Sequence, residues 1–369
     1  MNDVIFLDYN ATTSPASEVL AKMNEAYQFP LNNSSSHQLG RLATRFVEEA
    51  RTELKKLLNA ENYEVIFTSS STEATNNVMF GLDVKTIIFS GIEHSSVYEC
   101  RPADKKIIEI GALENGLIDL SDLEKKLPQE GNFLVSVMLA NNETGAIQQV
   151  EQIAKLVHQN GGLFHCDVVQ AVGKIPVDLE KINADFASVS SHKLRGPQGV
   201  GALLMRKGLD IKPLIYGGKQ EKSKRAGTTN VAGIAGFGEA CKMATGKIPL
   251  YENIKKLRDE LEAEITKIGG TDVKIFATEA PRLPNTSYIA TKNREAKTQL
   301  MNFDLNKICV SAGPACSSGT STESRILKAM GIEPEFSKSA VRVSMSPETS
   351  RDEIKKFIAV WSEFYQKTK

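Results

Sequence analysis

The first two thirds of the chain alternate short apolar segments with longer amphipathic ones, and this alternation constrains the fold more than any other feature. Apolar runs that predict buried strands occupy residues 4–8, 64–69, 85–90, 133–140, 162–167 and 186–190. Between them, residues 42–58 and 150–160 place apolar side chains at helical spacing and predict helices. Strands that alternate with helices favour a mostly parallel sheet covered by helices on both faces. Ligands of such sheets bind outside the carboxyl ends of the strands.

The length of the chain predicts two domains. Its 369 residues exceed what one compact core usually holds. We expect a large domain over residues 16–246. A long charged helix begins at Tyr251 and opens a smaller domain, which we expect to comprise residues 1–15 and 247–369.

Charge and composition argue against several classes of protein. Lys and Arg together number 45, as do Asp and Glu, so the zero net charge favours neither nucleic acid nor an anionic membrane as a partner. The N-terminal residues lack the basic flank and apolar core of a signal peptide, and no apolar run approaches the length of a membrane span. The five cysteines are scattered without a CxxC pair, unlike those of a disulfide framework or a zinc site. We therefore expect a cytoplasmic protein.

Two reactive side chains follow predicted strands directly. Lys193 comes after the strand 186–190, where a desolvated lysine could act as a Schiff-base nucleophile, although a lone lysine there is more often a surface residue of a turn. Asp167 ends the strand 162–167, where its carboxylate could keep a pyridinium nitrogen protonated or could simply cap a helix. Gln170, three residues on, could donate a hydrogen bond to a phenolate oxygen of the same ring.

Further polar residues follow three other strands. Ser71 and Thr72 begin a predicted helix, where they could hold a phosphate or serve only as helix caps. His94 could stack on an aromatic cofactor or move a proton, although a lone histidine is more often structural. Asn142, with its neighbours Asn141 and Glu143, could bind a ring oxygen or a substrate carboxylate. A phosphate cradle, a carboxylate for a ring nitrogen, a stacking histidine and a lysine together describe pyridoxal 5′-phosphate (PLP).

These segments are similar to those of the cysteine desulfurases of the NifS/IscS type, which belong to the class V aminotransferase group of fold-type I PLP enzymes. The specific motifs are SSHKLRGPQGVGAL, NNETGAIQ, HCDVVQAVGKIPVDL, RAGTTN and GPACSSGT, and the similarity runs from residue 7 to residue 354. The resemblance implies an α/β fold in which helices sandwich a large, mostly parallel seven-stranded sheet, beside a smaller α/β domain. It also implies removal of sulfur from L-cysteine, which gives L-alanine and a persulfide on Cys316. That persulfide would pass to a sulfur-acceptor or iron–sulfur scaffold protein for iron–sulfur cluster and thio-cofactor assembly.

The resemblance implies a role for each site residue. Lys193, which would bind PLP covalently, His94, which would stack on the ring, and Cys316 would be catalytic. The remaining cofactor-binding residues would be Ser71, Thr72, Asn142, Asp167, Gln170, Ser190, His192 and Thr228. Thr228 would reach the phosphate of a neighbouring subunit, which implies a homodimer. Asn142 and Arg342 would hold the substrate carboxylate, for which a guanidinium fork is well suited, although Arg342 could instead form a surface salt bridge.

Cys316 lies in PACSSGTST, among small and hydroxylated residues. A free cysteine is usually a small buried hydrophobe, but a Gly/Ser-rich loop would let a thiol visit both a cofactor and a partner protein. Pro314 stands where the family commonly has a small residue, and residues 321–324 also depart from the family pattern, which affects loop motion and acceptor choice. The resemblance implies no resident metal, although Cys316 could transiently ligate an iron–sulfur cluster.

Two other functions are compatible with parts of this pattern. Another class V PLP enzyme, such as a selenocysteine lyase or an aminotransferase, would share the cofactor residues. A non-catalytic scaffold would share only the fold. The presence of Lys193, Asp167, His94 and Cys316 favours an enzyme, because a scaffold needs none of them.

Overall fold

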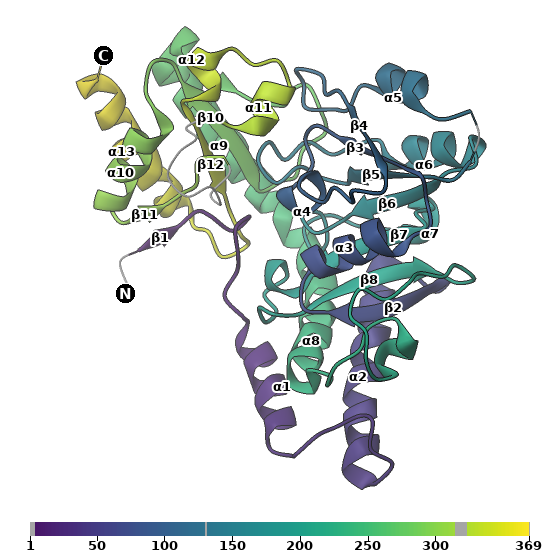
Figure 1. Cartoon of the computed structure of the whole chain (residues 1–369). Coiled ribbons are helices and arrows are strands. Elements are labelled where there is room, and N and C mark those ends of the chain that lie inside the picture. The colour runs from purple at the N-terminus through teal and green to yellow at the C-terminus, as the bar shows by residue number, and fades with distance from the viewer. Residues whose placement is uncertain (1–3, 130, 314–322, 369) are drawn as a thin grey trace.

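The computed structural model describes residues 4–129, 131–313 and 323–368, and its largest element is a seven-stranded sheet (Figure 1). The strand order is β2 (Tyr63–Thr68), β8 (Gly201–Arg206), β7 (Phe186–Ser190), β6 (Leu163–Asp167), β5 (Phe133–Met138), β3 (Thr86–Ser90) and β4 (Lys106–Ile110). Strands β4, β3, β5, β6 and β7 run parallel, whereas β8 is antiparallel to both of its neighbours. The predicted mostly parallel, seven-stranded sheet is confirmed.

Helices cover both faces of this sheet. Successive side chains of each strand point to opposite faces, and both faces are apolar and must be buried. On β5, Leu134 packs into the core formed with α3 (Ser71–Gly81) and α4 (Ser95–Tyr98). Its neighbour Val135 belongs to the larger core on the other face. Helices from the first two thirds of the chain that contribute to this larger core are α1 (Ser17–Tyr27), α2 (Gln38–Leu58), α5 (Leu120–Lys126), α6 (Val150–Gln159), α7 (Leu179–Ile182) and α8 (Val231–Lys247).

Helix α2 shows how the sequence pattern becomes packing. Phe46, Ala50 and Leu54 of the predicted apolar face are buried, and only Leu42 at its start remains partly exposed. The helix ends at Asn59, whose left-handed backbone has a φ of 45°. A Cβ atom at Gly238 of α8 would lie 2.5 Å from the Cα of Ala50, so glycine is required where these two helices cross. The two helices pack side by side below the sheet in Figure 1.

The structure differs from the predicted strands at two places. The segment 4–8 forms only the two-residue strand β1 (Ile5–Phe6), which pairs in parallel with β11 (Ile308–Cys309) outside the large sheet. Strand β4 was not predicted from the sequence. It lies at the sheet edge and its residues are mostly exposed or half-buried, so it lacks the continuous apolar run of a central strand.

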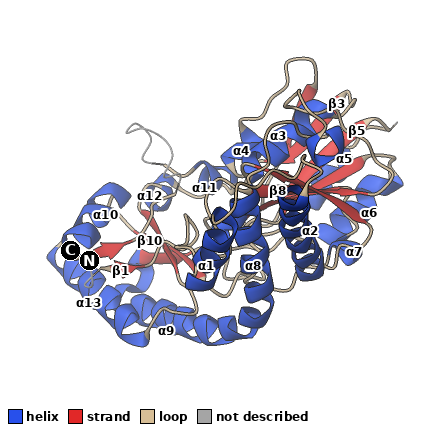
Figure 2. Cartoon of the chain, turned by 90° about the horizontal axis from the view of Figure 1, so that it is seen from below, coloured by secondary structure: helices blue, strands red, loops and turns tan. Residues whose placement is uncertain are grey.

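A second sheet and a second core lie beside the large sheet (Figure 2). Strand β10 (Thr286–Thr291) is paired antiparallel with β9 (Val273–Ile275) and β12 (Ala340–Ser344). Helices α9 (Tyr251–Gly269), α10 (Ala296–Leu305) and α13 (Arg351–Lys367) supply most of this core. Leu7 joins the same core from the N-terminal segment. Helices α11 (Arg325–Ala329) and α12 (Pro334–Ser337) instead pack on the larger core, through Ile326, Leu327 and Phe336. The domain boundaries 16–246 and 1–15 with 247–369 stay a prediction.

Within the described residues, no helix is both long enough and apolar enough to span a bilayer.

Candidate active site

A cavity of about 430 Å³ opens at the carboxyl ends of the parallel strands. Its wall includes most of the site residues predicted from the sequence, namely Ser71, Thr72, His94, Asn142, Asp167, Gln170, Ser190, His192 and Lys193. These residues follow β2, β3, β5, β6 and β7, so the edge at which the strands end brings together groups that are far apart in the sequence.

Two described site residues, Arg342 and Thr228, are not on this wall. Arg342 lies on β12, with its Nη1 2.9 Å from the backbone oxygen of Asn142 and its Nη2 2.6 Å from Asp8 Oδ1. Its side chain is only 5% exposed, so the ion pair with Asp8 is not a surface salt bridge. Thr228 is exposed and lines a neighbouring pocket instead. Cys316 lies outside the described residues, as does Pro314.

Lys193 reaches across the cavity to the N-terminal segment. It ends a single 3₁₀ turn, Ser191–Lys193, that follows β7 directly. Its Nζ donates hydrogen bonds to the backbone oxygen of Asn10 and, at 2.6 Å, to that of Ala11. The amine is therefore held at a defined place by main-chain acceptors.

Asp167 is a buried carboxylate at the end of β6. Its Oδ1 accepts a hydrogen bond of 2.9 Å from the backbone N–H of Val169. Burial raises the pKa of Asp167 to about 6, and this hydrogen bond and the Lys193 ammonium oppose the rise only in part. A cationic N–H beside the carboxylate would favour its charged form. This position therefore suits a protonated ring nitrogen.

Two histidines on the wall are uncharged at neutral pH. His94 caps α4, and its Nδ1 accepts from the backbone N–H of Ser96 at 3.2 Å. Burial, together with the nearby Lys193 charge, lowers the pKa of His94 to about 4. The same two causes lower the pKa of His192 to about 4, and its Nδ1 lies 3.0 Å from Thr12 Oγ1. A neutral imidazole can stack on an aromatic ring and can either take up or donate a proton.

Another part of the wall is the first turn of α3. Ser70 caps this helix by accepting from the backbone N–H of Glu73 at 3.2 Å. The first-turn amides and the hydroxyls of Ser71 and Thr72 form a site that favours an anion, because helix N-termini leave backbone donors unpaired. Strand β8 approaches this turn so closely that a Cβ atom at Gly201 would lie 2.5 Å from the carbonyl carbon of Ser70.

These groups fit PLP. Anion-binding donors, a buried carboxylate and a lysine amine lie on the wall of one cavity, as the phosphate, ring nitrogen and aldehyde of PLP require. Asn142 Oδ1 is buried without a hydrogen-bond partner among the described residues, so the cavity also contains a polar atom that a ligand could satisfy.

A family model decides the assignment. The model for class-V aminotransferases matches residues 5–357. The chain belongs to the class-V aminotransferase family. As a member it depends on PLP, which agrees with the cavity just described.

Relatives of this class-V aminotransferase are cysteine desulfurases. It is 38% identical to the cysteine desulfurase IscS of Dictyoglomus turgidum, in an alignment that covers 96% of this chain and 92% of the relative. It is also 38% identical to cysteine desulfurase 2 of Trichormus variabilis, over 96% and 91% of the two chains. The crystal structure of a NifS-like protein from Rickettsia africae superimposes with a TM-score of 0.92 at 38% identity, over 98% of this chain and 99% of the other. The resemblance to the NifS/IscS type and the predicted fold are confirmed.

Two of the candidate polar residues form hydrogen bonds within the fold and do not line the cavity. Asn141 is fully buried, and its Oδ1 accepts from the backbone N–H groups of Glu143 and Thr144, each at 2.9 Å. The Glu143 carboxylate accepts a hydrogen bond from Ser324 Oγ. Neither Asn141 nor Glu143 lies on the cavity wall. Of the three neighbours, only Asn142 can meet a ligand there.

The sequence did not single out three buried polar residues near the site: Asn10, Glu93 and Lys174. Asn10 lies in the motif LDYNATT and Lys174 in HCDVVQAVGKIPVDL. The similarity to the family begins at the first of these segments and includes the second, but neither Asn10 nor Lys174 was assigned a role. Their contacts with distant segments could not be read from local spacing.

Glu93 connects the ends of β3 and β5. Its Oε1 accepts from Ser90 Oγ and, at 3.0 Å, from the backbone N–H of Met138, whereas Oε2 is buried without a partner among the described residues. Burial raises the pKa of Glu93 from its ordinary value of 4.5 to about 8, so this carboxyl group is protonated in the folded protein at neutral pH.

We predict that Glu93→Gln flattens the pH dependence of stability. Because the folded pKa lies above the unfolded one, the stabilisation by the protonated acid is complete below pH 4.5 and is lost as the pH rises to about 8. Relative to the variant, the wild type should lose about 1.4 kcal/mol of unfolding free energy per pH unit in that interval. Urea unfolding of both proteins without PLP, from about pH 5.5 to about pH 8, measures this difference. Parallel curves for the two proteins would show that Glu93 does not titrate there.

Proposed function

We propose that this enzyme moves the sulfur of L-cysteine onto Cys316, releases L-alanine, and passes the resulting persulfide to acceptor proteins for iron–sulfur cluster and thio-cofactor assembly. The family and its cysteine desulfurase relatives support the reaction type. The observation that carries the proposal is that Lys193, Asp167 and His94 lie on the wall of one cavity.

Each side chain around the cavity has a separate role in the proposed reaction. PLP, when bound, supplies an electron sink for bond changes at the substrate carbons. Asp167 keeps the ring nitrogen protonated, and Gln170 donates a hydrogen bond to the ring oxygen. The amine of Lys193 binds the cofactor and takes up the proton from the substrate Cα. His94 packs on the ring and, being neutral, can accept a proton from the incoming substrate.

The sulfur transfer itself balances without an external oxidant. The Cys316 thiolate attacks the substrate sulfur, so an S–S bond forms while the substrate Cβ–S bond breaks. The Cβ atom takes the electron pair of the broken bond and then a proton, and becomes the methyl group of alanine. The sulfur is oxidised to the persulfide level, and the carbon is reduced by the same two electrons.

Arg342 is our candidate for holding the substrate carboxylate. Its guanidinium is oriented by Asp8 and by the backbone oxygen of Asn142, a residue of the cavity wall. Its Nε is buried without a hydrogen-bond partner among the described residues. A buried, unsatisfied donor next to the cavity is suited to a carboxylate ligand.

We predict that Arg342→Lys raises the KM for L-cysteine and leaves the absorbance of bound PLP unchanged. Lysine keeps the positive charge but loses the fork that can meet two carboxylate oxygens. The loss of one charge-assisted hydrogen bond corresponds to an increase of KM of about tenfold or more. Steady-state kinetics measure it. Arg351→Lys is the matched control, because Arg351 is exposed, pairs with exposed Glu260, and neither residue lines the cavity. A wild-type KM for Arg342→Lys would remove Arg342 from this role.

We infer that the active enzyme is a cytoplasmic homodimer. Thr228 is exposed and lines a pocket next to the cavity, so a second subunit could bring its own Thr228 to the phosphate. The large apolar side chains Leu214, Ile215 and Tyr216 are also exposed, the last to 76%, shortly before that segment. Light scattering after size exclusion measures the mass in solution, and a monomer with full activity would contradict the inference.

One assay tests the proposed reaction. The PLP-loaded enzyme is incubated with L-cysteine, alanine and sulfide are quantified, and the peptide that contains Cys316 is weighed by mass spectrometry. Before a thiol reductant is added, we expect a Cys316 peptide heavier by one sulfur atom. The reductant then supplies the two electrons that release this sulfur as sulfide, and we expect alanine and total sulfide in equal amounts. Transfer of the amino group to a 2-oxo acid without sulfur release would instead identify an aminotransferase. A colourless protein that cannot be reconstituted with PLP would indicate a scaffold.

A further inference from the structure

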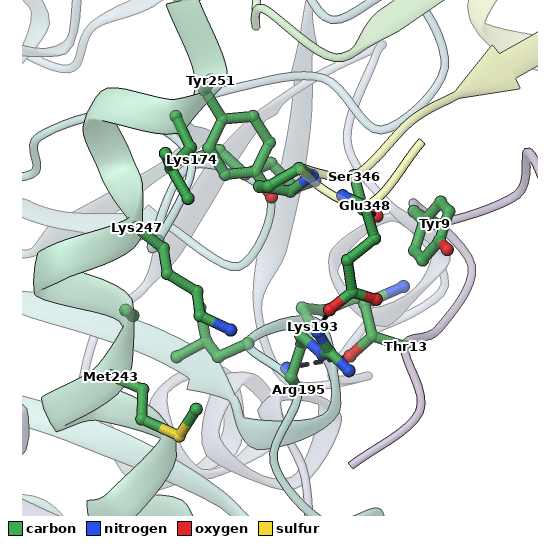
Figure 3. A pocket seen from close by; sticks show the side chains of 15 residues that line it. Tyr9, Thr13, Lys174, Lys193, Arg195, Met243, Lys247, Tyr251, Ser346 and Glu348 are labelled. Carbon is green, nitrogen blue, oxygen red and sulfur yellow. Dashed lines mark hydrogen bonds and ion pairs between the residues drawn. The ribbon is translucent and has the colours of Figure 1, made fainter. Parts of the chain in front are cut away.

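Lys174 is a buried lysine that the proposed chemistry does not use. Only 3% of the residue is exposed. Its Nζ lies 2.8 Å from Asn10 Oδ1 and 2.8 Å from Gln170 Oε1. Among the described residues it forms no ion pair with an acidic side chain. It also lines a second cavity, of about 190 Å³, which borders Lys193 and is enclosed by α8, the start of α9 and residues 346–348 (Figure 3).

The contacts of Lys174 match those of an uncharged amine. A neutral amine has two N–H bonds, and each of them has an acceptor here, Asn10 Oδ1 and Gln170 Oε1. Burial, followed by the nearby charges of Lys193 and Arg342, lowers the pKa of Lys174 well below its usual range. Lys174 can therefore donate two hydrogen bonds without adding a buried charge beside Lys193.

The hydrogen bond from Lys174 is one of two contacts that hold the Gln170 amide in one orientation. With Oε1 accepting from Lys174, Nε2 is placed 3.0 Å from the backbone oxygen of Asn10 and donates to it. The second N–H of Nε2 then remains for the PLP cavity, whose wall includes Gln170. With the amide flipped, the oxygen would face the cavity, and a nitrogen would face the donor Lys174.

Asn10 extends this arrangement to Lys193. Its side-chain oxygen accepts from Lys174 and, at 3.1 Å, from Asn285 Nδ2. Its backbone oxygen accepts from both Gln170 Nε2 and Lys193 Nζ. The two groups that face the cofactor therefore share one acceptor, and Lys174 binds the side chain of the same residue. Asn10 itself is only 1% exposed, so it has little freedom to move.

We propose that Lys174 is a positioning residue that holds the Gln170 amide so that an N–H, and not the carbonyl oxygen, meets the ring oxygen of PLP. This inference rests on the PLP site of the proposed function. A donor at that place favours the ionised ring oxygen, and an acceptor would favour the protonated one. Lys174 thereby sets the ionisation of the cofactor without touching it.

The spectrum of bound PLP tests this role directly. In full-length, PLP-loaded Lys174→Met the donor to Gln170 Oε1 is lost, and only the hydrogen bond from Nε2 to the backbone oxygen of Asn10 still opposes a flip of the amide, so the ring oxygen should be protonated more easily. We expect the ratio of the visible to the near-ultraviolet absorbance band to fall about fivefold at fixed pH, as the loss of one neutral hydrogen bond implies. Lys247→Met is the matched control, because Lys247 lines the same second cavity (Figure 3) but does not contact Gln170. Its spectrum should equal that of the wild type.

A double variant shows whether Lys174 acts through Gln170. Gln170→Leu should shift the spectrum by itself, and Lys174→Met should add nothing in that background, because effects that pass through one group are not additive. Equal shifts from Lys174→Met in both backgrounds, or a wild-type spectrum in the folded single variant, would overturn the proposal. If circular dichroism shows that Lys174→Met is unfolded, Lys174→Gln replaces it, since the shorter amide cannot reach both acceptors. A yellow wild type that releases no alanine would contradict the proposed reaction but not this role.

Discussion

Lys193→Ala is expected to lose PLP on dialysis and to form alanine and sulfide from L-cysteine at less than about one thousandth of the wild-type rate. The amine is the group on the cavity wall that can bind the cofactor covalently, and it is also our candidate for moving the Cα proton. Removing it takes away both functions at once. Visible absorbance before and after dialysis measures the first loss, and an alanine assay measures the second.

The fold should survive this substitution. Lys193 is half-buried, and its ammonium is held by the backbone oxygens of Asn10 and Ala11. Its removal therefore leaves two carbonyl oxygens that face a cavity that water can enter. Circular dichroism and a urea titration should give a curve close to that of the wild type. A folded Lys193→Ala protein that stays yellow after dialysis and forms alanine at the wild-type rate would contradict the assignment of Lys193.

Much of this site could be predicted because apolar runs that mark strands are followed directly by polar residues that can bind a ligand. Apolar runs located most of the large sheet, and the rule that ligands bind at the carboxyl ends of parallel strands then placed Asp167, Gln170 and Lys193 together. The prediction of strands from the sequence failed where a strand is only partly buried. Strand β4 carries exposed Lys106 and Glu109 at the sheet edge, so it has no continuous apolar run.

Long-range polar contacts could not be predicted by the same reasoning. Lys174 and Asn10 are 164 positions apart, and Asn10 and Asn285 are 275 apart. Nothing in the local spacing around these residues indicates that they meet. The N-terminal segment is an example. Its apolar residues predicted a short strand over residues 4–8, whereas Asn10, just beyond it, contacts Gln170 after β6 and Thr286 on β10. Such contacts depend on the tertiary fold and follow only from the coordinates.

Cys316 is the cysteine best suited by its sequence surroundings to accept sulfur, and the described cysteines are poor alternatives. Only a thiolate attacks sulfur efficiently. Burial raises the pKa of Cys100 to about 11, and it raises the pKa values of Cys166 and Cys241 above their usual range as well. Burial also raises the pKa of the partly exposed Cys309 thiol, with help from Asp304 and Asp8. None of these four side chains lies on the wall of the PLP cavity.

Cys316→Ala should therefore bind PLP with a wild-type spectrum and form neither sulfide nor alanine above about one thousandth of the wild-type rate. Cleavage of the substrate C–S bond needs an acceptor for the sulfur, and none of the four described cysteines lies on the cavity wall. The matched control is Cys309→Ala, which removes a partly exposed cysteine on β11 and should retain wild-type activity. Absorbance, alanine and sulfide are measured on the same preparations, so loss of cofactor and loss of chemistry are distinguished. If Cys316→Ala released sulfide and alanine as fast as the Cys309→Ala control, the persulfide mechanism would be wrong, because the sulfur would leave the substrate without passing through Cys316.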